Sequence, residues 1–484
     1  MSKIVRMRGF LTSSSGVLPL TVRSLGAACA AVLALAPAPP AFGSASTATG
    51  PGRDGGADLG RAVSEGAVPG STRSLPLVPL SREGVPGAAP EQGVRRTGLG
   101  RFALLGVVWD DPGTELRGRV RVRTRSAVTG RWTGWQDVET HADHGADPSS
   151  AERTARRVRG ATAPLWVGAS DGVDVRVRAG KTDAGDGRGP LPAGLRLELV
   201  DPGEDPGETA AEPGTAGQAD EAPAAGAPVD EPPRTTLDTE AAIAASGANA
   251  DIAAFGTTEI PELDGPATEE ELTKLQGPVR AKPYIGPRPK IVTRRGWGAD
   301  ESLRGRGFVY TKKIKAAFVH HTASGNNYTC AQAPSVIRGI YRYHVKSMGW
   351  RDIGYNFLVD KCGTLYEGRA GGVAKPVLGA HTLGFNTDSM GVAVIGSYGT
   401  VQPPGAAVTA VARLAAWKLG LHGADPRAKT YLTSGGGNLY PKGKKVRLNV
   451  MSGHRDGYAT ECPGKRLYAK LGTARTSAAR YQGR

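Results

Sequence analysis

The stretch from Asp201 to Arg280 constrains the fold of this chain more than any other feature. It consists mainly of Ala, Gly, Pro, Glu and Asp, and it holds 18 acidic residues against 3 basic ones. Such a composition cannot bury a core, so we expect a flexible, self-repelling acidic linker over residues 202–285. Its ATEEELTK stretch is expected to form no more than a helical turn. With 484 residues, the chain is long enough for a separate folded domain on each side.

The part of the chain that follows this linker is strongly basic. Residues 281–484 contain 32 Lys and Arg against 9 Asp and Glu, in a chain whose formal net charge is +16. A basic block of this size favours a polyanionic partner, which is either nucleic acid or an anionic cell envelope.

The N-terminus distinguishes between these two partners. Basic residues up to Arg23 precede the short apolar run Leu25–Ala36, and the small residues AFGSAS follow. This order is typical of a secretory signal peptide, predicted here over residues 1–45, although a disordered basic leader is the alternative. The run is too short to span a bilayer comfortably, and no later segment approaches about 18 apolar residues. We therefore expect a secreted or wall-associated protein with no stable membrane span and no nucleic-acid partner.

Residues 72–201 show the alternation typical of β-strands. In LRGRVRVR, Leu116, Gly118, Val120 and Val122 alternate with four arginines, and GVDVRVR repeats the pattern. This predicts an antiparallel β-sandwich-like domain with one face in water. The arginines could bind an anionic polymer and Trp132 and Trp135 could stack on sugars. We favour the simpler interpretation of a solvated strand face and core tryptophans.

Residues 289–475 mix strand and helix patterns. Strands are predicted at IKAAFVHH, YNFLVD, TLYEGR, MGVAVIG and VRLNVM, and helices at APSVIRGIYRYHVKSMG and VTAVARLAAWKLGLHG. The central strands are apolar on both faces, which favours an α/β domain whose mixed sheet is covered by helices.

Cysteine and histidine are scarce, so their positions are informative. Of four cysteines, Cys29 lies in the predicted signal peptide, and the odd number that remains leaves one thiol to be explained. Cys330 and Cys362 are the candidate disulfide partners, which leaves Cys462.

Two histidine-containing stretches predict a metal site. His320 and His321 end the KAAFVHH strand, and His454 stands seven residues before Cys462 in a turn-forming stretch. Imidazole and thiolate ligands in an exported protein favour a tetrahedral zinc site with one position left open. The third ligand would come from the strand-end histidines, and zinc binding would keep Cys462 from oxidation.

Five ordered blocks resemble a known family. RRGWGADES, AAFVHHTA, IRGIYRYHVKSMGWRDIGYNFLVDKCGTLYEGR, GAHTLGFNTDSMGVAVIG and SGHRDGYATECPG are similar, in order and spacing, to the peptidoglycan recognition proteins of the type 2 N-acetylmuramoyl-L-alanine amidase family. The resemblance covers about Pro289 to Leu471. The Ala, Gly and Arg bias of the chain fits a secreted protein of a high-GC actinobacterium.

The resemblance implies a ligand set. It assigns zinc to His320, His454 and Cys462. Strand alternation places Phe318 and His320 on one face and His321 on the other, so we expect His321 to orient a ligand or to make core hydrogen bonds.

The resemblance also implies roles for neighbouring side chains. Tyr355 matches the tyrosine that polarises the scissile carbonyl. Thr460 stands where some catalytic members have lysine; a threonine hydroxyl can only donate a hydrogen bond to the oxyanion, which leaves the proton shuttle open. His344, His381 and Asn386 match positions that line the peptide groove.

A last pair concerns the stem peptide: Gly349 and Trp350 resemble the pair associated with diaminopimelate-type stems. We therefore expect a secreted, monomeric zinc amidase that cleaves between N-acetylmuramic acid and L-alanine of peptidoglycan, with anionic wall polymers as further partners. The alternatives are a non-catalytic peptidoglycan-binding protein, whose members typically lose the cysteine ligand, and a wall-anchoring protein led by the sandwich.

Overall fold

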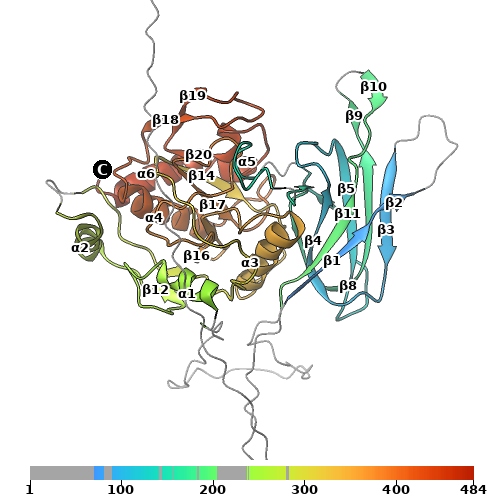
Figure 1. The fold of residues 1–484 in the computed structure, drawn as a ribbon, viewed down its shortest axis with the longest axis horizontal. Coiled ribbons are helices and arrows are strands. Elements are labelled where there is room, and N and C mark those ends of the chain that lie inside the picture. Colours follow the sequence, from blue (N-terminus) through green and yellow to red (C-terminus); the bar gives the residue numbers. More distant parts are fainter. Residues whose placement is uncertain are drawn as a thin grey trace, which may run out of the picture. The chain divides into compact units, whose positions relative to one another are not determined.

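The computed structural model describes residues 70–80, 90–140, 144–155, 157–182, 185–203, 237, 239–278 and 283–484. The predicted signal peptide and residues 204–236 of the predicted linker lie outside these ranges. The described residues belong to one compact unit, which contains a β domain (described residues within 70–203) and an α/β domain (described residues within 239–484), both drawn in Figure 1. Among the described residues, no helix is long and apolar enough to cross a membrane.

The β domain is built on a nine-stranded antiparallel sheet around one apolar core, and β9 and β10 form a separate two-stranded sheet. Its strands are β1 (Ser71–Pro76), β2 (Val78–Pro79), β3 (Glu91–Arg96), β4 (Phe102–Trp109), β5 (Gly118–Ser126), β6 (Gln136–Val138), β7 (Gly160–Ala161), β8 (Leu165–Ala179), β9 (Lys181–Thr182), β10 (Gly185–Arg188) and β11 (Arg196–Asp201). The main path runs β1-β11-β4-β8-β3-β2, and β5 pairs with β8 and β6. The predicted alternation is confirmed, since Val120, Val122 and Val177 point into the core while Arg119 and Arg121 are exposed.

Strand β4 corrects the expectation that the whole second face of this sheet lies in water. All eight of its residues are buried. Leu105 and Val107 belong to the core of the β domain, whereas Leu104 and Val108 belong to a second core that also contains residues of helix α3 (Ala333–Arg342). A strand buried on both faces reads as a continuous apolar run, and FALLGVVW is such a run.

The two tryptophans of RWTGW are not core residues. The interpretation of Trp132 and Trp135 as core tryptophans is therefore wrong. Trp132 and Trp135 are only partly buried. The Arg123 guanidinium carbon lies 5.3 Å and 5.0 Å from their ring centroids, and Arg121 lies 5.4 Å from Trp135. Cation–π stacking therefore places both rings on the outer, arginine-rich face.

The α/β domain is built on a seven-stranded mixed sheet. Its elements are α1 (Glu240–Gly247), β12 (Glu259–Ile260), α2 (Gly265–Gln276), β13 (Ile291–Val292), β14 (Ala316–His321), α3, the π-helix Tyr343–Ser347, β15 (Phe357–Val359), β16 (Leu365–Glu367), β17 (Ser389–Val394), α4 (Gly405–Gly420), β18 (Lys429–Thr433), β19 (Lys445–Asn449), β20 (Met451–Gly453), the 3-10 helix His454–Asp456, α5 (Lys465–Tyr468) and α6 (Leu471–Tyr481). The order is β12-β13-β16-β15-β17-β14-β20. The predicted fold class is confirmed.

Helices cover both faces of this sheet. Helices α4 and α6 lie side by side in Figure 1 and share a core with Val319 of β14 and Val392 of β17. Residues of α3 form the second core, on the other side, with Leu358 and Ala393. The predicted disulfide between Cys330 and Cys362 is present, and it ties the start of α3 to the turn after β15.

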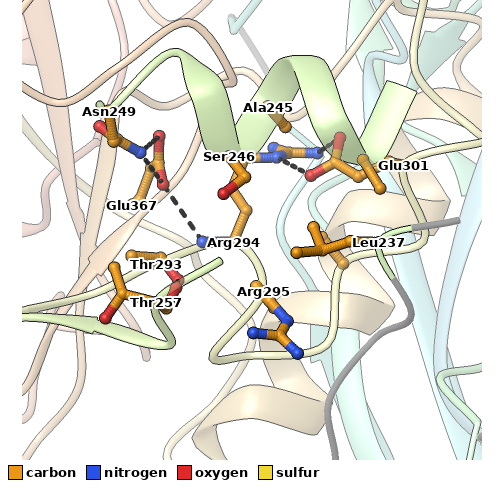
Figure 2. Close-up of a pocket in the computed structure, with 12 residues that line it drawn as sticks. Leu237, Ala245, Ser246, Asn249, Thr257, Thr293, Arg294, Arg295, Glu301 and Glu367 are labelled. Atoms are coloured by element: carbon orange, nitrogen blue, oxygen red, sulfur yellow. Dashed lines mark hydrogen bonds and ion pairs between the residues drawn. The ribbon is translucent and has the colours of Figure 1, made fainter. Parts of the chain in front are cut away.

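Residues 239–278 do not behave as a linker, which corrects the prediction for that part of residues 202–285. Thr239 and Asp264 cap α1 and α2 through their side chains, and β12 pairs with β13. Figure 2 shows how the end of α1 is held: Asn249 Nδ2 donates to both carboxylate oxygens of Glu367, at 3.0 Å each. The composition of this stretch indicated too little apolar surface for a core of its own. The rest of the α/β domain supplies the surface against which these residues pack.

Candidate metal centre

Four side chains that can bind a metal converge at one point. One ligand atom each from His144, His320, His454 and Cys462 lies within 4.8 Å of all the others. His320 is in β14, His454 begins the 3-10 helix after β20, and Cys462 lies in the loop before α5. His144 comes from the β domain, in the segment between β6 and β7.

Strand pairing explains why two of these histidines meet. Strands β14 and β20 are parallel neighbours, and Val319 is paired with Gly453. The residue that follows each member of this pair is a histidine, so His320 and His454 stand at the same edge of the sheet. Their ring centroids are 4.6 Å apart.

Two distances to the cysteine sulfur are close to those of a tetrahedral zinc site. Zinc bound to nitrogen at about 2.0–2.1 Å and to sulfur at about 2.3 Å holds these two ligand atoms about 3.5 Å apart. The Sγ atom of Cys462 lies 3.7 Å from His320 Nδ1 and 3.9 Å from His144 Nε2. The donor set, imidazole with one thiolate, is also one that zinc prefers.

His321 lies on the opposite face of β14 and supports the cluster without joining it, as predicted. Its backbone N–H donates to Cys462 Sγ at 3.4 Å. Its ring Nδ1 accepts from the backbone N–H of Tyr398 at 3.2 Å. His321 thus makes the core hydrogen bonds expected of it.

Thr382, which the sequence did not single out, orients His320. Its hydroxyl oxygen lies 3.3 Å from His320 Nε2 and 3.0 Å from His381 Nδ1. A metal bound to Nδ1 of His320 would leave the proton of that ring on Nε2, from which it can be donated to Thr382. The threonine hydroxyl can then donate to His381. Metal-binding histidines commonly have such a second hydrogen bond, which fixes the tautomer of the ring.

Burial favours the neutral form of His320 and of His144. It lowers the pKa of His320 well below the usual value, and His454 adds to the effect. Burial also lowers the pKa of His144 to about 3. A neutral imidazole is the form that binds a metal.

Tyr355 lies beside the cluster in the loop before β15. It is 2 % exposed, and its ring centroid is 5.6 Å from that of His320. Burial raises the pKa of its hydroxyl well above 10, so the hydroxyl remains a hydrogen-bond donor. The hydroxyl oxygen of Thr460 accepts from the backbone N–H of Cys462 at 3.2 Å, so its own proton is left for another acceptor.

The groove residues expected from the sequence are brought together, but they are buried. His344, Trp350, His381 and Asn386 are each at most 3 % exposed. The rings of His344 and Trp350 are 4.5 Å apart. His344 lies in the π-helix, a distortion often found at functional sites.

Residues 144–155 of the β domain, here called the covering segment, contact this groove. Asn386 Nδ2 donates to the Gly145 carbonyl and to the Asp147 carboxylate, at 2.8 Å each. The sequence signal for this contact was slight: His144 is one of 8 histidines in the whole chain.

The two domains match separate families. Residues 310–465 match the family described as N-acetylmuramoyl-L-alanine amidase. Residues 62–222 match the family described as Rv3811 N-terminal galactose-binding domain-like.

Individual relatives match the α/β domain. Peptidoglycan-recognition protein SC2 of Drosophila simulans is 31 % identical over 183 residues, which is 38 % of this chain and 85 % of that protein. The human N-acetylmuramoyl-L-alanine amidase is 34 % identical over 189 residues, 38 % of this chain and 28 % of that protein. Among solved structures, peptidoglycan recognition protein-LE in complex with tracheal cytotoxin is 30 % identical, with a TM-score of 0.30 over 38 % of this chain and 92 % of that one. The chain belongs to the family of peptidoglycan recognition proteins and N-acetylmuramoyl-L-alanine amidases.

Proposed function

We propose that this protein is a secreted, zinc-dependent N-acetylmuramoyl-L-alanine amidase. It would hydrolyse the amide between the lactyl group of N-acetylmuramic acid and the L-alanine of the stem peptide. The observation that carries the proposal is the buried group of His320, His454 and Cys462, with Tyr355 beside it. Cys462 is the ligand whose loss is associated with binding-only members of the family.

In this proposal His320, His454 and Cys462 hold the metal, and Thr382 holds His320 in the required tautomer. Zinc, when bound, supplies a Lewis acid for the carbonyl oxygen and lowers the pKa of a water to about 7. The buried hydroxyl of Tyr355 donates a hydrogen bond to the carbonyl oxygen as negative charge develops there. Thr460 contributes a second, weaker donor.

The overall reaction consumes one water. A C–O bond forms at the lactyl carbonyl carbon, and the C–N bond to L-alanine breaks. The products are a free lactyl carboxylate on the sugar and a stem peptide with a free L-alanine amino group.

The substrate side of the proposal rests on the groove and on charge. His344, Trp350, His381 and Asn386 would contact the stem peptide, and the Gly349–Trp350 pair favours a diaminopimelate-type stem. The excess of basic residues in 281–484 suits a wall that carries phosphate polymers.

The test is a hydrolysis assay with the full chain. Purified diaminopimelate-type peptidoglycan is incubated with the zinc-loaded protein, and released peptides are identified by mass spectrometry. We expect peptides that begin with a free L-alanine, and we expect none after chelation or with Cys462→Ser. Peptidoglycan that is bound by the zinc-loaded protein but stays intact would instead identify a binding protein.

A further inference from the structure

We propose that His144 is a fourth protein ligand to the metal, and that the covering segment closes the site until it is displaced. This inference rests on the proposed function, because it concerns the access of substrate to the same centre. It gives the β domain a regulatory role toward the α/β domain.

The position of His144 is that of a ligand. Its Nε2 atom lies 3.9 Å from Cys462 Sγ, and its ring centroid is 4.7 Å from that of His454 and 5.2 Å from that of His320. Catalytic zinc sites have three protein ligands and one open position, whereas structural sites have four protein ligands. His144 occupies the position that water and substrate need.

His144 also covers the proposed oxyanion donor. Its ring meets that of Tyr355 edge to face, with centroids 5.3 Å apart. A scissile carbonyl cannot approach the Tyr355 hydroxyl from the metal side while this ring is in place.

The covering segment is held over the groove by two sets of contacts. In the first, the Asp147 carboxylate accepts from the backbone N–H of Gly384 at 2.9 Å and from Asn386 Nδ2 at 2.8 Å, and the Gly145 carbonyl accepts from the same amide. A carbonyl and a carboxylate are also the acceptors that a stem peptide offers. The segment therefore takes, from within the same chain, the backbone and amide donors that a stem peptide would use.

The second set is a buried ion pair. Both guanidinium Nη atoms of Arg369 donate to the Glu152 carboxylate at 2.9 Å, and the backbone N–H of Arg351 donates to it at 3.2 Å. The Glu152 and Arg369 side chains are 11 % and 5 % exposed. A bidentate pair of this kind fixes orientation as well as adding energy. Just beyond the segment, Arg157 Nε donates to the Gly349 carbonyl at 3.0 Å.

These contacts make closure and substrate binding mutually exclusive. The metal position and the Asn386 amide cannot serve the covering segment and a stem peptide at once. If the open state is a minor state of about 0.1–10 % of molecules, releasing the segment raises turnover by about 10- to 1000-fold.

The first experiment reads coordination rather than activity. The full chain is loaded with Co²⁺, whose visible bands report its ligand geometry, and azide is titrated as a small anion that needs an open position. We expect azide to leave the parent spectrum unchanged and to shift the spectrum of His144→Ala. Thr154→Ala is the matched control, because Thr154 is exposed on the same segment, and it should behave as the parent does. An equal response to azide in the parent and in His144→Ala overturns the inference.

The second experiment measures release. The variant His144→Ala/Asp147→Ala/Glu152→Gln removes the ligand, the Asp147 carboxylate and the charge of Glu152, and so weakens both sets of contacts. Its melting temperature and zinc content show whether it remains folded and loaded. We expect it to hydrolyse peptidoglycan at least about tenfold faster than the parent. A folded, loaded variant with the parent's rate overturns closure. A variant that gains the azide response but cleaves no peptidoglycan supports His144 as a ligand and overturns the amidase proposal.

Discussion

The Nδ1 atom of His320 lies 3.7 Å from the Sγ atom of Cys462, although 142 positions separate the two residues in the chain. The parallel pairing of β14 with β20 brings His454 beside His320, and the loop that follows returns Cys462 to the same point. The backbone of His321 then donates to the cysteine sulfur. The centre thus depends on sheet register as much as on the ligands.

The Thr382 hydroxyl should contribute to metal affinity without contacting the metal. Thr382→Val keeps the shape of the side chain but removes the partner of His320 Nε2. Loss of such a supporting hydrogen bond typically weakens metal binding by about 10- to 100-fold. Competition with a chromophoric chelator measures this change. Thr409→Val, at an exposed position of α4, is the control, and equal zinc affinities for the two variants would show that Thr382 does not support the centre.

Tyr355→Phe should impair hydrolysis while leaving the fold intact. The ring and its packing remain, but the proposed oxyanion donor is lost, and removing one such donor typically costs about 100- to 1000-fold in turnover. Zinc content and melting temperature should stay those of the parent. To remove the effect of the covering segment, the rates are compared in the His144→Ala/Asp147→Ala/Glu152→Gln background. If Tyr355→Phe leaves turnover in that background unchanged, Tyr355 has only a packing role.

Thr460→Val should have a smaller effect than Tyr355→Phe, measured by the same release of L-alanine peptides. The threonine hydroxyl is a neutral donor, and its oxygen already accepts from the Cys462 N–H. The variant also removes that acceptor, so zinc content must be measured with the rate. A loss larger than that of Tyr355→Phe, at full zinc content, would reverse the proposed roles.

Local pattern in the sequence was sufficient for much of the α/β domain. Alternation in AAFVHH separated His320 from His321, and the apolar stripe of α3 was visible because Val336, Ile337 and Ile340 recur at helical spacing. Strand alternation and a helical stripe depend only on residues that are close in the chain, so they can be predicted from the periodicity of the sequence.

What the sequence did not reveal depends on contacts between distant segments. His144 lies 176 positions before His320, and nothing in its own surroundings indicates which domain its ring will meet. Thr382 is a supporting residue only because β17 brings its loop to the cluster. The helices α1 and α2 were missed because a composition argument ignores the surface that another part of the chain can offer, such as Glu367 for Asn249.

The disulfide between Cys330 and Cys362 should stabilise the α/β domain. It closes a loop with a sequence separation of 32, for which the chain-entropy estimate is about 3–4 kcal/mol. Mass spectrometry of peptides from the unreduced protein identifies the bridge, and denaturation of Cys330→Ser/Cys362→Ser measures its effect. A bridge that contains Cys462 would contradict both the disulfide and the metal centre.

Lys418 in α4 should make stability depend on pH. Its Nζ donates to the carbonyls of Val373 and Lys375 at 2.6 and 2.8 Å, and burial lowers its pKa from 10.5 to about 7. Between these pH values the unfolded chain binds more protons than the folded one, so the free energy of unfolding rises with pH, by up to about 1.4 kcal/mol per unit. Lys418→Met removes this contribution.

The measurement is urea unfolding of the parent and of Lys418→Met from pH 7 to pH 10. The stability of the variant relative to the parent should fall steadily across this range, because only the parent gains stability as the pH rises. Lys429→Met, at an exposed position in β18, is the control and should differ from the parent by a constant amount. A constant difference for Lys418→Met as well would place the Lys418 pKa near its ordinary value.

The most direct test of the account is the ligand shell of zinc in the loaded full chain, determined by X-ray absorption together with elemental analysis. The account predicts one zinc per chain, with one sulfur at about 2.3 Å and histidine nitrogens at about 2.0–2.1 Å. Cys462→Ser should lose the sulfur, whereas His422→Ala, which changes a histidine outside the cluster, should leave the shell unchanged. Less than about half an equivalent of zinc after reconstitution, or a shell without sulfur, would contradict the proposed centre.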